Sequence, residues 1–132
     1  METYIIKPKV EFVNVVSNQR QKNLSNRQVM RIGRYDERNK YRVLFNIPIN
    51  EIPADAEILS AKLFINIIDI EGRYLNKLTP YPIIEGWSID TVNWCNQPKF
   101  SKDKCDQNVN IKTKPQYIFE ITTIIQIFST KC

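Results

Sequence analysis

The residues best suited to chemistry lie in one stretch, "GWSIDTVNWCNQPKF", which covers residues 86–100. Trp87 and Trp94 stand seven positions apart within it. Exposed tryptophan rings could form a platform for a sugar, whereas buried rings would anchor a hydrophobic core. Trp94 shares a face with Val92 in an expected short strand, so packing against an opposite sheet would explain both tryptophans. Core anchoring is therefore the favoured interpretation.

Two carboxylates, Glu85 and Asp90, flank Trp87 and raise the question of glycoside hydrolysis. That reaction needs two carboxyl groups about 5–9.5 Å apart across the sugar. Acids beside a turn are more often solvated. The chain also contains no histidine, which excludes His-based general bases and nucleophile relays. We therefore expect a protein that is not an enzyme.

Sugar binding would require an exposed aromatic ring with amide or carboxylate groups beside it. Several side chains in expected loops fit that description, and the sequence alone does not rank them. The candidate ligand-binding residues are Tyr35, Tyr74, Tyr81, Phe100, Asn76, Asn96 and Gln97.

The three cysteines, Cys95, Cys105 and Cys132, are too few and too scattered for a structural zinc site in a chain without histidine. Cys95 and Cys105 bracket a polar loop and could close a small disulfide in an oxidising compartment, leaving Cys132 for an intermolecular bond. Three unpaired thiols are an equal alternative. No cofactor is expected, although Asp103 and Asp106 offer oxygen ligands for a structural calcium ion.

The net charge of +5 is concentrated in the first third of the chain. Residues 1–42 contain ten Lys and Arg against four Asp and Glu, a net of +6, and residues 43–132 contain nine against ten, a net of −1. Such a basic stretch could face an acidic polysaccharide, teichoic acid or nucleic acid. No nucleic-acid-binding motif accompanies it, so a solvated surface is favoured and nucleic acid is the weakest candidate partner.

Two-residue alternation of apolar side chains predicts strands rather than helices along most of the chain. The pattern is clearest over residues 41–47 and 58–68. Only residues 122–129 suggest a short helix, for which Thr122 is the expected N-cap. Further strands are expected at residues 3–6, 10–16, 28–32, 78–84, 91–94, 109–111 and 117–121.

The length of 132 residues predicts a single domain, residues 1–132, around one core. About eight or nine short strands favour an all-β antiparallel sandwich with at most one short helix near the C-terminus. No apolar run is long enough to span a membrane, and the first residues show no secretory signal. The chain would then be part of a larger exported protein or reach its place by another route. The expected core anchors are Phe45, Leu63, Trp87 and Trp94.

Three segments follow one another in a characteristic order: "YRVLFNIPINEIPADAEILSAKLFINI", "EGWSIDTVNWCNQPKF" and "YIFEITTIIQIF". Together with the opening "ETYI", they make nearly the whole chain resemble the DNRLRE-type family, also called disaggregatase-related, which is close to a group of carbohydrate-binding modules. The matching residues are Arg42, Phe45, Pro53, Ile58, Ser60, Ala61, Leu63, Trp87, Val92, Trp94, Asn96, Pro98 and Thr122.

The resemblance implies a jelly-roll-like sandwich of the kind found in exported, cell-surface or matrix proteins, often appended to polysaccharide-degrading enzymes. It also implies a non-catalytic module that binds polysaccharide. The expected location is therefore extracellular or on a cell or spore surface.

The chain departs from the family in three respects. The string that names the family is absent, and Ile89 stands where members usually carry an acidic residue. Members also continue into one more strand, whereas this sequence stops at Cys132. A sandwich without that strand would have an open sheet edge. The sequence therefore leaves an alternative open, a self-assembling structural subunit of a fibre, coat or appendage whose copies are joined by strand exchange or disulfides.

Overall fold

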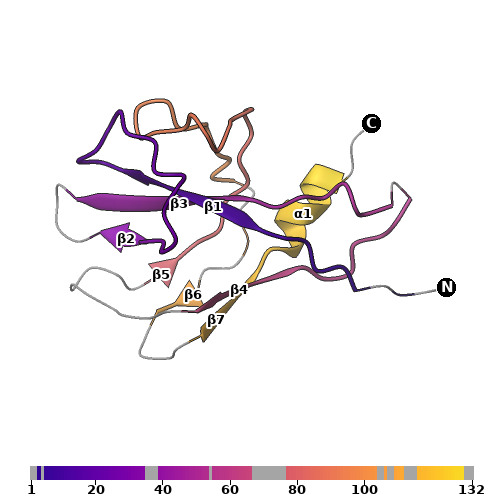
Figure 1. Cartoon of the computed structure of the whole chain (residues 1–132). Helices are drawn as coiled ribbons and strands as arrows, with labels where there is room; N and C mark the ends of the chain where they lie inside the picture. The colour runs from indigo at the N-terminus through magenta and orange to yellow at the C-terminus, as the bar shows by residue number, and fades with distance from the viewer. Residues whose placement is uncertain are drawn as a thin grey trace.

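A computed structural model describes Thr3 and residues 5–34, 39–53, 55–66, 77–103, 106, 109–111 and 116–129. In these residues the chain forms strands that pair in small antiparallel sheets, followed by one short helix near the C-terminal end (Figure 1). The expected all-β class is confirmed at this level. In the described part of the chain, no helix is long and apolar enough to cross a membrane.

The largest sheet is antiparallel and has the order β1-β3-β2, with β1 (Glu11–Val16), β3 (Lys40–Asn46) and β2 (Gly33–Arg34). Val13 and Val15 are fully buried on one face of β1, and Leu44 of β3 pairs with Val13. Asn14 and Val16 are buried on the other face. Branched side chains suit this position because they pack well on a pleated surface. Because residues on both sides of β1 are buried, both of its faces are covered by other parts of the protein.

Two smaller antiparallel sheets are formed by β4 (Lys62–Asn66) with β7 (Gln116–Glu120), and by β5 (Lys77–Leu78) with β6 (Val109–Asn110). The two-residue period is clearest in β7, where Tyr117 and Phe119 are buried and Ile118 is exposed. Ile65 is the buried residue of β4. One face of the β4–β7 sheet therefore turns toward the core and the other toward solvent.

Helix α1 (Thr122–Ser129) follows β7 directly and confirms the short helix expected at residues 122–129. Ile124 and Ile125 are buried against the strands, and Phe128 packs beside them one turn later. An eight-residue helix is too short to be stable alone in water, so this apolar face holds it in place.

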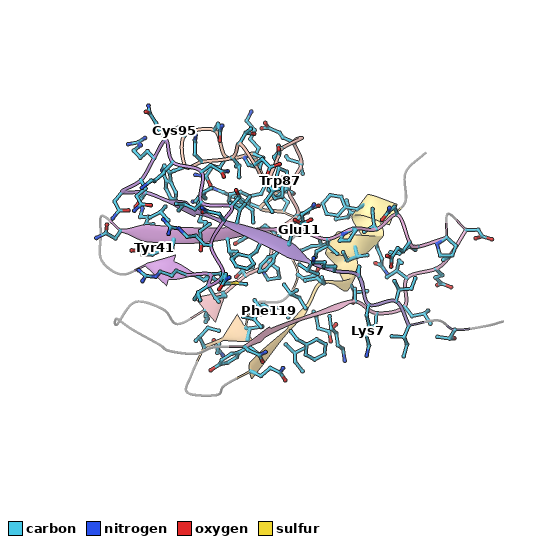
Figure 2. The ribbon with its side chains drawn as sticks, viewed as in Figure 1. Lys7, Glu11, Tyr41, Trp87, Cys95 and Phe119 are labelled. Atoms are coloured by element: carbon cyan, nitrogen blue, oxygen red, sulfur yellow. The ribbon has the colours of Figure 1, made fainter. Side chains whose placement is uncertain are left out.

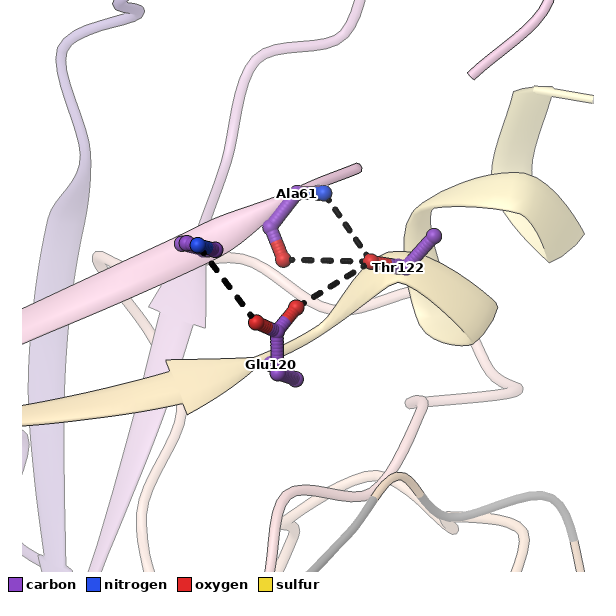
Figure 3. Close-up of polar contacts among 4 residues, drawn as sticks. Ala61, Glu120 and Thr122 are labelled. Atoms are coloured by element: carbon purple, nitrogen blue, oxygen red, sulfur yellow. Dashed lines mark hydrogen bonds and ion pairs between the residues drawn. The ribbon is translucent and has the colours of Figure 1, made fainter. Parts of the chain in front are cut away.

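The start of α1 is capped by a residue that lies far away in the sequence. The carboxylate of Asp106 accepts hydrogen bonds from the backbone amides of Thr123 (3.3 Å) and Ile124 (3.0 Å). The expected cap, Thr122, instead uses its hydroxyl to accept a hydrogen bond from the Ala61 amide at 3.0 Å (Figure 3). The prediction of Thr122 as N-cap is therefore wrong, because this hydroxyl bonds the segment leading into β4.

Two hydrophobic clusters lie on opposite sides of the large sheet. The first gathers Ile65, Ile111, Tyr117, Phe119, Ile121, Ile124 and Ile125, with Phe45 and Leu63 packed against it partly buried. The second gathers Val13, Val15, Leu44 and Val92, with Ile83, Trp87, Ile89 and Trp94 packed against it. Figure 2 shows Trp87 and Phe119 on opposite sides of β1 and β3. Strand β3 contributes to both clusters because Leu44 and Phe45 point to opposite faces.

The strand expected at residues 28–32 does not form. Its backbone is bonded by the buried side chain of Asn14, which donates to the carbonyls of Arg31 (2.6 Å) and Arg42 (2.9 Å) and accepts from the Arg31 amide (2.9 Å). A side-chain amide can replace a strand partner in this way because it offers both donors and an acceptor.

Four other expected strands differ from those observed. Residues 91–94 form turns, in which the amides of Thr91 and Val92 both donate to the Ser88 carbonyl. The strand expected at residues 58–68 begins only at Lys62. The strand expected at 78–84 is reduced to β5 and a single bridge between Ile83 and Phe100. In the stretch 3–6, the described residues Thr3, Ile5 and Ile6 lie outside any strand.

Candidate functional site

Residues 83–100, here called the Trp loop, have no regular secondary structure and lie across one face of the large sheet (pink to orange, Figure 1). Val92 packs into the sheet from the middle of this loop. The ends of the loop are held together, since the Ile84 amide donates to the Lys99 carbonyl at 2.9 Å. The loop is therefore a closed unit seated on the sheet by its own apolar side chains.

The basic N-terminal third of the chain is attached to the Trp loop. The side-chain amide of Asn23 donates to the carbonyls of Ile89 and Val92, both at 2.9 Å. The Cys95 amide donates to the carbonyl of Arg20 at 3.1 Å. These contacts place Arg20 and Asn23, at the start of the basic stretch, directly beside the loop.

An asparagine pair shapes the turn that follows Val92. The side-chain oxygen of Asn96 accepts from the Asn93 amide (2.6 Å), and that of Asn93 accepts from the Asn96 amide (2.9 Å). The Asn96 side chain also donates to the Thr91 carbonyl at 3.2 Å. Its amide group is therefore engaged within the loop.

Arg42 of β3 reaches the Trp loop and lies beside a group of four other side chains. These five residues are here called the Arg42 cluster: Arg42, Tyr81, Trp94, Gln97 and Phe100. The guanidinium carbon lies 5.1 Å from the Trp94 ring centroid and 5.6 Å from that of Phe100. Its Nη1 donates to Gln97 Oε1 at 3.0 Å, and Gln97 Nε2 donates to the Trp94 carbonyl at 3.0 Å. Tyr81 and Phe100 have ring centroids 5.0 Å apart at 47°. Two rings and an amide thus hold the guanidinium in place.

The charge of Arg42 is not matched by a carboxylate in the part of the chain that the structure describes, where the one ion pair joins Lys62 and Glu120. A guanidinium carries five N–H donors in one plane. One of them bonds Gln97. The cluster therefore presents a preorganised cation with donors to spare.

A cavity of about 690 Å³ opens beside the Arg42 cluster. Cavities that hold small ligands measure about 300–1,000 Å³ and combine apolar walls with a few polar groups. Here the apolar walls come from β3, β4, β7 and α1. Near the cluster, the polar and aromatic lining includes Arg42, Tyr81, Glu85, Trp87, Gln97, Phe100 and Lys102.

The structure brings three of the candidate ligand-binding residues together. Tyr81, Gln97 and Phe100 all lie in the Arg42 cluster and line the cavity. Asn96 lies in the same loop with its side chain bonded internally. The remaining candidates, Tyr35, Tyr74 and Asn76, lie outside the described residues.

The two tryptophans combine a core role with a position near the cavity. Trp87 and Trp94 pack against the cluster around Val13, and each stays partly accessible. Trp94 stacks with Arg42, and Trp87 lines the cavity. Each tryptophan therefore packs against the core and also contributes to the candidate site.

Of the two flanking acids and the two expected calcium ligands, one of each makes a structural hydrogen bond and the other is exposed. Glu85 Oε1 accepts a hydrogen bond from the Lys99 amide at 3.3 Å, and Asp90 is exposed. Asp106 caps α1, whereas Asp103 is exposed. Among the described residues, no three acidic or cysteine side chains lie close enough to share a metal ion.

Of the disulfide candidates, Cys95 carries an exposed free thiol in the Trp loop. Cys105 and Cys132 lie outside the described residues.

Sequence reasoning did not identify Arg42 as a site residue. Two-residue alternation places it on the same face of β3 as Leu44, which is buried against residues of the Trp loop, whereas Arg42 itself is exposed. An arginine between apolar positions of a strand was the available signal, because a guanidinium beside apolar groups favours an environment of aromatic rings. The rings that provide that environment are more than 50 residues away in sequence, at Trp94 and Phe100.

No known protein family, curated protein or solved structure matches the chain.

Proposed function

We propose that the protein is a non-catalytic module that binds an acidic polysaccharide through the Arg42 cluster. The observation that carries this proposal is the stacked guanidinium of Arg42, which bonds Gln97 and has no carboxylate partner among the described residues. A carboxylate of the ligand would supply the partner that this guanidinium lacks. Arg binds carboxylates through two parallel N–H···O bonds, and such charge-assisted bonds are about twice as strong as neutral ones.

The arrangement of rings favours an acidic ligand over a neutral one. A neutral sugar would need an open aromatic face to stack on, together with hydrogen-bonding groups beside it. In the Arg42 cluster, the guanidinium already lies against Trp94 and Phe100. Tyr81, which is 40% exposed, remains as a ring for the sugar body. The cluster thus combines one stacking surface with one carboxylate-binding group.

The charge distribution supports the same ligand class. The chain carries a net charge of +5, and its basic N-terminal third is bonded to the Trp loop through Asn23 and Arg20. A positive field raises the local concentration of a polyanion and speeds its association. Lys102 adds a further cation at the cavity itself.

The wider context of the proposal rests on the sequence pattern alone, in the three segments that resemble the DNRLRE-type family. The two hydrophobic clusters on either side of the large sheet fit a layered, jelly-roll-like sandwich of that kind. A module of this kind would work outside the cell or on a cell or spore surface, where polysaccharides are found. Binding without catalysis is consistent with a chain that contains no histidine.

The proposal is tested by isothermal titration calorimetry with two uronate polymers, polygalacturonate and hyaluronate. Arg42→Gln removes the cation and leaves a side chain that can still bond Gln97. We expect it to weaken binding at least about tenfold, because hydrogen bonds to charged groups contribute about 1.5–3 kcal/mol.

The matched control is Lys7→Gln, which removes the same charge from an exposed side chain far from the Trp loop (Figure 2). We expect it to retain most of the affinity, since its contribution is limited to the long-range field. Equal losses for the two variants would show that only net charge matters, and the Arg42 cluster would not be the site.

A further inference from the structure

Strand β4 has a second edge that no other strand in the described part of the chain covers. It pairs with β7 on one side, in the register Lys62↔Glu120 to Asn66↔Gln116. An uncovered strand edge presents a row of backbone donors and acceptors that can pair with another chain.

The register shows which backbone groups face this edge. The Ile121 amide donates to the Ala61 carbonyl at 2.9 Å, one position beyond the strand pair and in the same register. Hydrogen-bonded pairs alternate along an antiparallel ladder. The pairs Leu63–Phe119 and Ile65–Tyr117 are therefore bonded to each other. The N–H and C=O groups of Lys62, Phe64 and Asn66 point away from β7, toward the uncovered edge.

The same three residues carry their side chains on the solvent face of the sheet. Phe64 is 57% exposed, and its cross-strand partner Ile118 is 47% exposed. Polar pairs flank these two residues. Lys62 Nζ lies 3.7 Å from Glu120 Oε1, and Gln116 Nε2 donates to Asn66 Oδ1 at 3.0 Å. An exposed apolar centre with a polar rim is typical of a protein interface.

We propose that this edge pairs with the same edge of a second copy, around a two-fold axis through Phe64. The antiparallel arrangement places Phe64 opposite Phe64 of the second copy, and Lys62 opposite its Asn66. Each of these pairs exchanges two backbone hydrogen bonds. The product is a continuous sheet with the order β7-β4-β4-β7.

Strand β4 is complementary to itself in this register. No like charges meet, because Lys62 faces an asparagine. On the core side, Leu63 faces Ile65 of the second copy, so apolar side chains continue across the junction. A slip of one residue would set the outward N–H and C=O groups of Phe64 opposite Leu63 or Ile65, whose own groups are bonded to β7. Such a register loses backbone hydrogen bonds across the junction and is disfavoured.

The interface is small, and this sets the expected affinity. Five residues of strand span about 17 Å, whereas a stable interface buries about 800 Å² on each partner. The dimer should therefore be a reversible one that forms at high protein concentration. This pairing is more specific than the strand exchange left open by the sequence, because no element leaves its own chain.

The test uses sedimentation equilibrium of the full chain in reductant, so that disulfides do not contribute to the mass. Wild type should show a mass that rises from monomer to dimer with concentration. Phe64→Lys and Phe64→Glu each place like charges opposite each other at the axis, and each should weaken the dimer by about tenfold or more. An equimolar mixture of the two variants should recover the dimer, because opposite charges then meet at position 64.

The matched control is Ile118→Lys, which changes the same exposed face without touching the edge. It should dimerise nearly as well as wild type. Equal loss in Ile118→Lys and Phe64→Lys would point to stacking of the two faces and overturn edge pairing. A wild type that stays monomeric at all concentrations, or a mixture that does not recover the dimer, would overturn it as well.

Discussion

Asn14 shows how one buried polar side chain can replace a strand. Its amide satisfies three backbone groups of Arg31 and Arg42 from a position that is 5% exposed. Removing it would leave those groups without these bonds inside the protein, where a lost partner costs about 1–3 kcal/mol. We expect Asn14→Ala to lower the free energy of unfolding by about 2–3 kcal/mol, measured by chemical denaturation.

The control for this prediction is Asn46→Ala, an exposed change in neighbouring β3. It should alter the free energy of unfolding by less than about 0.5 kcal/mol. Similar losses for both variants would mean that the three hydrogen bonds of Asn14 contribute little.

At the scale of elements, the cap of α1 is the contact most open to test. Asp106 places its carboxylate on two amides at the helix N-terminus, where negative charge is also favoured by the helix dipole. Asp106→Ala should destabilise the protein by about 1 kcal/mol, in the usual range for a lost cap. Thermal unfolding would detect this change as a lower midpoint.

Asp103→Ala provides the comparison, because Asp103 is an exposed acid three positions away. It should leave the midpoint nearly unchanged. If both variants unfolded at the same temperature as wild type, the carboxylate of Asp106 would not stabilise the helix.

The elements also show what the sequence could predict. Strands β1, β3, β4 and β7 and helix α1 lie within or beside the ranges expected from two-residue alternation and from the Thr-initiated turn. The strand expected at residues 28–32 is missing because the Asn14 side chain bonds backbone that would otherwise join a ladder. At residues 91–94 the Ser88 carbonyl and the Asn93–Asn96 pair hold the backbone in turns. Alternation reports burial and carries no information on such distant bonds.

The candidate site was predictable in part for a related reason. Tyr81, Gln97 and Phe100 were recognisable as aromatic or amide residues that could contact a sugar. Arg42 was not, because its role depends on rings contributed by a loop distant in sequence. Local pattern identifies residue types, while the fold decides which of them meet.

At the scale of the whole molecule, the proposed function depends on a local binding contact and on the net charge of the protein. The Arg42 cluster supplies the specific contact with a carboxylate, and the net charge of +5 supplies attraction at longer range. A reversible dimer would carry two such clusters, and linked sites on a repeating polymer bind more tightly than one site alone.

The most direct test compares binding of polygalacturonate with binding of the same polymer after reduction of its carboxyl groups, as the salt concentration is raised. Salt shortens the range of electrostatic attraction from about 10 Å at 0.1 M to about 3 Å at 1 M. The account predicts clear binding of the acidic polymer that weakens steadily with salt, and little binding of the reduced polymer at any salt. Equal, salt-independent binding of the two polymers, or no binding of either at low salt, would contradict it.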